Sequence, residues 1–245
     1  MVDTQKKLIS QLQKDILRWQ GFTAPSGSSH DHIGLGEIEV AFPNGVFPKG
    51  TIHEFLTFEP EHTAAGSGFI GGLLKVLMGE GSACLWIGVA RKLFPIAFGS
   101  FGIEPDRIIF LDLKNEKEVL WATEEALKCE GLAAVVAELR EISFTQSRRL
   151  QLAVEKSKVT GFILRTDPLK LSTTACAARW QITPLSSLLE GAMPGVGFPR
   201  WNVELLKVRN GNPGSWTVEW NAGQFVIVAE ERAVAELSHQ TLKAG

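Results

Sequence analysis

The residues whose types and spacing come closest to a chemical site are Gly66, Ser67 and Gly68, which follow a predicted strand at 51–56. A strand, a glycine-rich loop and a helix in that order are the layout of a phosphate-binding loop, whose backbone N–H groups hold the phosphates. Such a loop ends in Gly-Lys-Ser/Thr, because the Lys reaches the outer phosphates and the hydroxyl meets magnesium. Here Gly66 is followed by Ser67 and Gly68 instead. The segment therefore predicts a nucleotide-binding architecture that no longer binds nucleotide in the usual way.

Two further features of this segment indicate which ligands it could bind. Glu59 and Glu61 stand in the predicted loop, where their charges would repel an anion. The run from Gly66 to Gly71 also matches the dinucleotide fingerprint G-x-G-x-x-G. A Rossmann strand runs directly into the first glycine and the next strand ends in an acidic residue, and this chain shows neither feature. The alternative interpretation is that the small residues let a helix pack closely on a sheet.

The cysteines and histidines show no metal-binding spacing. Cys84, Cys129 and Cys176 lie far apart without a C-x-x-C pair, so we expect reduced thiols, with Cys84 and Cys129 in the core. His30 and His32 fall in a Ser-rich linker and are expected at the surface. No Ser-His-Asp or Cys-His arrangement can be argued from the spacing. We therefore expect no metal, no cofactor and no catalytic residue.

Composition sets the class of protein. The chain has 245 residues, 44% hydrophobic and 21% charged, which suits one large domain or a domain with an arm. A net charge of −2 excludes a large basic nucleic-acid surface, so any direct DNA binding is expected to be weak and lost at moderate salt. No apolar run approaches the roughly 20 residues of a membrane span. No signal peptide is visible, and we expect a cytoplasmic protein.

Short apolar segments alternate with helical ones, which predicts an α/β fold with a parallel sheet covered on both faces. The later part of the chain has strands without helices and a turn at 209–214, which predicts an antiparallel C-terminal extension. The predicted strands are 51–56, 82–89, 107–112, 132–137, 159–164, 179–184, 201–208, 216–220 and 225–228. The predicted helices of the core are 69–79, 93–101, one with a capping box at Asn115 and Glu118 that ends before Gly131, and 145–157.

An N-terminal arm precedes this core. Residues 4–20 predict a helix in which Leu8, Leu12, Ile16 and Trp19 recur on one face. The stripe must pack on the main domain or on a partner, and both alternatives stay open. The expected organisation is an N-terminal helix and linker at 1–36, a core domain at 37–230 and a C-terminal tail at 231–245. A loop is expected at 186–199.

The order of these segments resembles the RecA core, and within that group the chain is most similar to the ImuA family of bacterial error-prone repair cassettes. The resemblance covers roughly residues 5–228. Each matching segment is weak by itself, and it is their order and spacing along the chain that make the resemblance specific. Four segments carry it: 47–54 (FPKGTIHE), 101–107 (FGIEPDR), 147–153 (SRRLQLA) and 198–206 (FPRWNVELL).

The resemblance implies where the catalytic groups of a RecA-type ATPase would fall. The loop Lys falls at Ser67, the hydroxyl at Gly68, and the water-activating Glu at Ala90. The magnesium-linked acid falls at Glu138, and the polar sensor near Arg165 and Thr166. Only Glu138 keeps suitable chemistry. Without the Lys, the hydroxyl and the base, phosphoryl transfer has no means of positioning phosphate or activating water.

The resemblance also implies a function. It implies a non-catalytic accessory protein of the DNA damage response, or SOS response, that supports mutagenic translesion synthesis. The implied partners are an ImuB-like Y-family protein, an error-prone replicative-type polymerase and RecA, with self-association through the arm as a further expectation. Arg148 and Arg149 fit either a partner-binding patch or a solvated helix face with a salt bridge. The alternatives are a SulA-like cell-division inhibitor and an ATPase with a divergent phosphate-binding loop.

Overall fold

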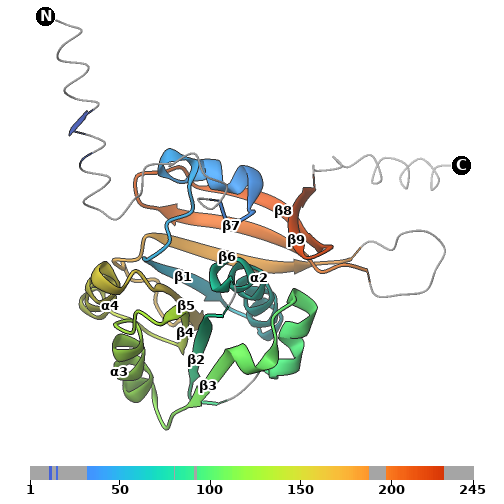
Figure 1. Ribbon diagram of the computed structural model, residues 1–245. Helices are drawn as coiled ribbons and strands as arrows, with labels where there is room; N and C mark the ends of the chain where they lie inside the picture. The colour runs from blue at the N-terminus through green and yellow to red at the C-terminus, as the bar shows by residue number, and fades with distance from the viewer. Residues whose placement is uncertain are drawn as a thin grey trace, which may run out of the picture.

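The computed structural model describes Gln11, Leu12, Asp15 and residues 32–79, 81–90, 93–187 and 197–228. In this part of the chain nine strands form one sheet in the order β3-β2-β4-β5-β1-β6-β7-β8-β9 (Figure 1). Neighbouring strands from β3 to β6 run parallel, and β6 to β9 are antiparallel. The predicted α/β class, with a parallel sheet and an antiparallel C-terminal extension, is confirmed.

The elements lie close to the predicted positions. The strands are β1 (Ile52–Thr57), β2 (Ala83–Gly88), β3 (Ile108–Asp112), β4 (Leu132–Leu139), β5 (Thr160–Thr166), β6 (Ala178–Leu185), β7 (Arg200–Val208), β8 (Gly214–Asn221) and β9 (Gln224–Val228). The described helices of the core are η2 (Gly36–Ala41), η3 (Pro43–Gly45), α2 (Pro60–Met78), η4 (Pro95–Phe101), η5 (Pro105–Arg107), α3 (Glu116–Ala126) and α4 (Phe144–Ser157).

Helices cover both faces of the parallel strands, because those strands are apolar on both sides. Helix α2 lies on one face and helices α3 and α4 on the other (Figure 1). The α2 side holds a core of aromatic rings in which Trp180 stacks on Phe55 and packs against Phe69. The opposite core is aliphatic and contains Val135 and Ile163. The sheet is therefore the middle layer of three.

Helix caps explain where two of these helices begin. The side chain of Asn115 accepts hydrogen bonds from the backbone N–H groups of Lys117 and Glu118, as a cap does. Glu118 reaches the N–H of Lys114 and the Asn115 amide rather than closing a full capping box. Such a box is present at α4, between Ser143 and Gln146, where the sequence analysis does not predict one.

Several expectations need correction. The helix predicted at 93–101 is the 3-10 helix η4, which begins at Pro95. The helix predicted at 69–79 is α2, which begins nine residues earlier, at Pro60. Cys129 is exposed rather than buried, whereas Cys84 and Cys176 are buried. Ile33 and Leu35, inside the predicted linker, are buried in the core on the α2 side.

Some predictions fall largely outside the described residues. These are the arm at 4–20 with Leu8, Ile16 and Trp19, the linker before residue 32, most of the loop at 186–199, and the tail at 231–245. Within the arm, Gln11, Leu12 and Asp15 are helical, and the Leu12 side chain is 50% exposed.

Candidate functional site

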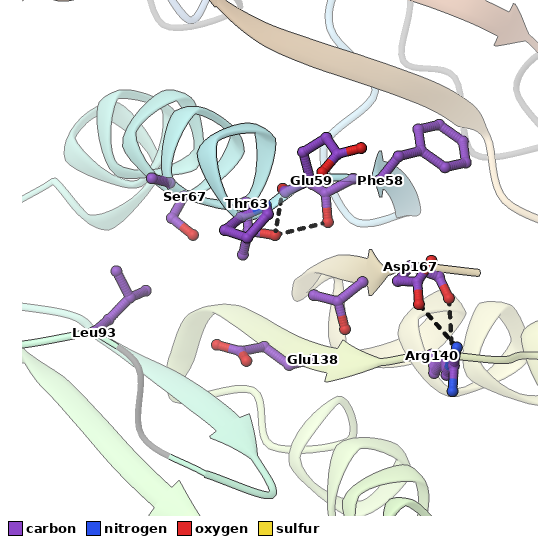
Figure 2. Close-up of a pocket in the computed structure, with 12 residues that line it drawn as sticks. Phe58, Glu59, Thr63, Ser67, Leu93, Glu138, Arg140 and Asp167 are labelled. Atoms are coloured by element: carbon purple, nitrogen blue, oxygen red, sulfur yellow. Dashed lines mark hydrogen bonds and ion pairs between the residues drawn. The ribbon is translucent and has the colours of Figure 1, made fainter.

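A cavity of about 500 Å³ lies where the carboxyl ends of β1, β4 and β5 meet the first turns of α2 (Figure 2). The carboxyl edge of a parallel sheet is the usual place for a ligand in an α/β protein. We call this space the polar hollow. It is lined by Thr57, Phe58, Glu59, Pro60, Thr63, Ala64, Ser67, Leu93, Glu138, Arg140, Thr166 and Asp167.

Helix α2 starts almost directly after β1, and this corrects the predicted loop. The strand ends at Thr57 and the helix begins at Pro60, which suits the first helical position because its missing N–H would be unpaired there. The Thr63 hydroxyl donates to Thr57 Oγ1 at 3.0 Å and lies 3.3 Å from the Glu59 carbonyl oxygen. These bonds tie the first turn of the helix to the strand end. Only Phe58 and Glu59 lie between the strand and the helix, which is too short a segment to form a phosphate-binding loop.

The glycines predicted as loop residues lie inside this helix. A Cβ on Gly66 would meet Thr57 and Leu164 at ordinary contact distances of 3.5 and 3.6 Å. A Cβ on Gly68 would stand 3.3 Å from the rings of Phe101 and Trp201. Gly68 thus lets α2 approach the aromatic core, as the packing interpretation proposed, whereas the space beside Gly66 would admit a methyl group. The dinucleotide interpretation is wrong, because its glycines must form the turn between strand and helix.

Further along α2, two more glycines show the same close approach. A Cβ on Gly71 would lie 3.0 Å from Phe101, and one on Gly72 would lie 2.4 Å from Phe225. Helix-interior glycine costs about 1 kcal/mol against alanine. Here the loss is offset by aromatic rings that occupy the space a side chain would take.

Three of the sequence-predicted positions come together at the polar hollow and its immediate neighbour. Ser67 faces the polar hollow from α2 and Glu138 from β4 (Figure 2). Glu138 accepts a hydrogen bond of 2.7 Å from the indole N–H of Trp86. Ala90 is exposed and lines a small neighbouring hollow that Glu138 also borders. Gly66 does not line either space, and Gly68 lines a different one.

Charge in the polar hollow is unfavourable for a phosphate. Among the described residues of its lining, Glu59, Glu138 and Asp167 supply three carboxylates and Arg140 one guanidinium. That guanidinium is held by the Asp167 carboxylate at 2.8 Å and donates to the Asp167 carbonyl oxygen. The Glu59 carboxylate at the start of α2 would repel an anion that entered here.

Behind the hollow lies a buried ion cluster that the sequence analysis does not predict. Glu54 on β1 accepts hydrogen bonds from Arg165 at 2.9 Å, Arg179 at 2.8 Å and the Thr174 hydroxyl at 2.8 Å. The side chains of Glu54 and Arg165 are completely buried. Arg165 also bonds the Glu141 carboxylate and the carbonyl oxygens of neighbouring loops. Of the two residues at the expected sensor position, Arg165 is therefore structural and offers no surface charge, whereas Thr166 lines the polar hollow.

One signal in the sequence marks this cluster. Glu54 stands inside the apolar strand Ile52–Thr57, where a carboxylate is costly unless it is paired. The pattern indicates a buried partner but does not say which of the chain's basic residues supplies it.

The candidate partner-binding residues on α4 lie away from the hollow. Arg149 forms an ion pair with Glu124 of α3, and Arg148 is exposed. The pKa of the Arg209 guanidinium is lowered, first by burial and then by the nearby positive charge of Arg148. The structure does not bring Arg148 and Arg149 together with Leu12 of the arm at one described site.

Two classes of site find no support in the described residues. Among them, no group of three His, Cys, Asp or Glu side chains could hold a metal ion. Within the same ranges, no helix is long and apolar enough to cross a membrane.

Comparison with known proteins finds similarity to ImuA proteins and, over a shorter stretch, to a SulA protein. The chain is 35% identical over 202 residues to Protein ImuA of Caulobacter vibrioides strain NA1000 / CB15N, a match that covers 76% of this chain and 82% of that protein. ImuA of a second Caulobacter vibrioides strain matches with the same figures. The cell division inhibitor SulA of Photorhabdus laumondii is 27% identical over 116 residues, covering 47% of this chain and 66% of SulA. No protein-family model matches the chain.

Proposed function

This chain belongs to the ImuA family, and we propose that it acts in the DNA damage response as a non-catalytic, RecA-like adaptor. In this proposal it supports mutagenic translesion synthesis in the cytoplasm through protein–protein contacts. Its partners are an ImuB-like Y-family protein and an error-prone replicative-type polymerase, with RecA as a further partner. It uses no nucleotide cofactor.

The observation that carries the proposal is the start of α2. A phosphate-binding loop needs several free backbone N–H groups between strand and helix, together with a Lys and a hydroxyl. Only Phe58 and Glu59 separate β1 from α2, and the Glu59 carboxylate borders the hollow in front of them. Nucleotide turnover has no supporting chemistry here.

The sheet supports the RecA-like part of the proposal. A parallel sheet with helices on both faces, continued by an antiparallel meander, is the arrangement that the resemblance to the RecA core implied. Such a core keeps its outer surfaces even when its nucleotide site is lost, and those surfaces remain available to protein partners.

We expect no saturable heat when Mg-ATP at millimolar concentration is titrated into the protein in a calorimeter. The double substitution Ser67→Lys with Gly68→Thr should not create binding, although it restores the residue types of the motif. Both positions lie within the helix, Ser67 is only 3% exposed, and the space beside Gly68 is filled by Phe101 and Trp201. The variant should instead melt at a lower temperature. Micromolar ATP binding by the unmodified protein would overturn the non-catalytic proposal.

We expect a tagged full-length chain to capture an ImuB-like protein from DNA-damaged cells, with partners identified by mass spectrometry. Undamaged cells and the tag alone are the controls. Capture of the division GTPase in place of polymerase-related proteins would favour the SulA-like alternative. The SulA match supports that alternative, but it covers less than half of this chain.

A further inference from the structure

The outer flank of helix α4 borders the strands of the antiparallel extension. Helix α4 packs on β1, next to β6, and α3 lies along its other flank, where Arg149 pairs with Glu124 (Figure 1). Strands β6 to β9 contribute no described residue to the aliphatic core beneath α3 and α4. Trp180 and Ile182 of β6 are buried in the core on the α2 side, so Gln181 between them faces the other way and is partly exposed. Within the described residues, the helix layer therefore ends at α4.

Three positively charged side chains gather beside this outer flank. Arg209 and Lys207, at the carboxyl end of β7, each donate to a carbonyl oxygen of the 174–175 segment. That segment is bonded to α4 at Ser147, the residue before Arg148. The pKa of the Arg209 guanidinium is lowered, first by burial and then by the charge of Arg148, so the two guanidinium groups are close to each other.

These three cations have no carboxylate partner in the part of the chain that the structure describes. None of the ion pairs there includes Arg148, Lys207 or Arg209. The negative charge of Glu155 on α4 acts on Arg209, and it offsets one of the three positive charges at most. Arg148 and Lys207 are exposed and Arg209 is half-buried. Like charges held together repel each other, and an incoming anionic group would relieve that repulsion.

Exposed apolar side chains lie beside the cations. Phe144 and Leu152 stand four residues before and four residues after Arg148, which puts all three on one flank of α4. Their side chains are 55% and 48% exposed. Leu206, next to Lys207 on β7, is 41% exposed. Cationic and apolar side chains that alternate along a helix flank are complementary to a segment whose own apolar residues alternate with carboxylates.

From these features we infer that the outer flank of α4 and the carboxyl end of β7 form a docking surface for an acidic, apolar linear segment of a partner protein. Carboxylates of the segment lie against the three cations, and its apolar residues cover Phe144 and Leu152. This inference rests on the proposed adaptor function and names the chemistry of one of the adaptor's contacts.

Charge identifies the occupant as a segment of another protein. The chain's own arm at 4–20 has four basic residues and one acidic residue, so the surface would repel it. The tail at 229–245 has three acidic and two basic residues, which leaves it close to neutral. Neither end of the chain is thus the acidic segment that the surface fits.

Panning a phage library of random dodecapeptides against the full-length chain tests the inference whatever the identity of the partner. We expect enrichment of peptides in which two or more Asp or Glu residues flank Leu, Ile, Phe or Trp. Fluorescence anisotropy of the best peptide then gives its dissociation constant. The double variant Arg148→Gln with Lys207→Gln should raise that constant at least about fivefold, because two ion pairs are lost. Raising NaCl from about 0.1 M to about 1 M should weaken binding as well, since screening grows.

Arg149→Gln is the matched control for Arg148→Gln. It removes the same charge from the next residue of α4, but from the flank that faces α3. Arg149→Gln should leave the dissociation constant unchanged within about twofold, whereas Arg148→Gln alone raises it. Glu155→Gln should strengthen binding, because it removes a negative charge that acts on Arg209. No enrichment, enrichment of basic peptides, or equal weakening by Arg148→Gln and Arg149→Gln would each overturn the inference.

Two other occupants are outcomes of the same measurement. If a single-stranded oligodeoxynucleotide binds the unmodified chain more tightly than the best peptide, and Arg148→Gln weakens that binding, the surface binds nucleic acid and the protein-segment assignment is wrong. If a synthetic peptide of residues 229–245 binds as tightly as the best selected peptide, and the double variant abolishes that binding, the chain's own tail is the occupant and the partner assignment is wrong.

The pull-down separates this inference from the proposed function. If the double variant captures the same repair proteins in the same amounts as the unmodified chain, the adaptor function stands and the docking surface is wrong. If the unmodified chain captures no repair protein but still selects acidic, apolar peptides through Arg148, the docking surface stands and the proposed function fails.

Discussion

Replacing Glu54 with Gln is expected to lower the free energy of unfolding by about 3–5 kcal/mol, the usual loss when one member of a buried ion pair is removed. Gln keeps the shape of the side chain but leaves Arg165, which is completely buried, with only the partly exposed Glu141 as a counter-charge. Arg179 loses the same carboxylate, and its side chain is only 14% exposed. Urea unfolding followed by tryptophan fluorescence measures the effect.

The matched control is Glu125→Gln on α3. Glu125 also pairs with a cation, Lys128 at 2.6 Å, but both side chains are about half exposed. Exposed pairs contribute little, so this substitution should change stability by less than about 1 kcal/mol. Adding Arg165→Met to the Glu54→Gln variant should recover part of the loss, because it removes a stranded charge. Equal effects of Glu54→Gln and Glu125→Gln would contradict the assignment of a buried cluster.

The second large effect is a loss of stability on acidification that depends on His53. Burial lowers the pKa of His53 from 6.5 to about 4, partly opposed by its hydrogen bond to the Pro48 carbonyl oxygen. His53 Nε2 donates to that oxygen at 2.9 Å, which leaves Nδ1 as the acceptor for the indole N–H of Trp180 at 3.3 Å. Protonation of Nδ1 would remove this acceptor. The ring also stacks on Phe47.

The sign follows from proton binding in the two states. Between pH 6.5 and pH 4 the unfolded chain binds a proton at His53 while the folded chain stays neutral there. Stability from this residue is therefore complete above pH 6.5 and is lost as the pH falls toward 4. The shift corresponds to about 3 kcal/mol.

A variant without a titrating ring isolates this contribution from the carboxylates that also titrate in acid. His53→Gln keeps a donor for Pro48, and its cost relative to the unmodified protein should shrink by about 3 kcal/mol between pH 7 and pH 4. Urea unfolding at a series of pH values gives the two stability curves. Parallel curves over this range would show that His53 titrates normally.

The order and class of the elements follow from local patterns in the sequence alone. Alternation of apolar strands such as 132–137 with helices such as 145–157 is a local signal, because each strand and helix shows its own periodicity. The antiparallel extension is equally predictable, since the turn at 209–214 carries its own Gly and Pro residues. These features depend on neighbours within a few residues.

The role of the glycines in α2 depends instead on contacts between distant segments. Glycine is a loop signal when only its neighbours along the chain are considered, and by that signal Gly66 and Gly68 belong to a loop. The rings that would crowd a side chain at Gly68 belong to Phe101 and Trp201, which are distant in sequence. Helix packing outweighs local propensity, and the expected phosphate loop is the interior of a helix.

The difference between local patterns and contacts of distant segments also decides which parts of the site can be predicted from the sequence. Glu54 can be recognised as a charge in an apolar strand, but its partners Arg165 and Arg179 lie 111 and 125 residues away. The polar hollow likewise forms only where the beginning of α2 meets the ends of β4 and β5. Residue types along the chain indicate which chemistry is missing. The cavity and the ion cluster behind it arise where segments meet whose separation along the chain no local pattern encodes.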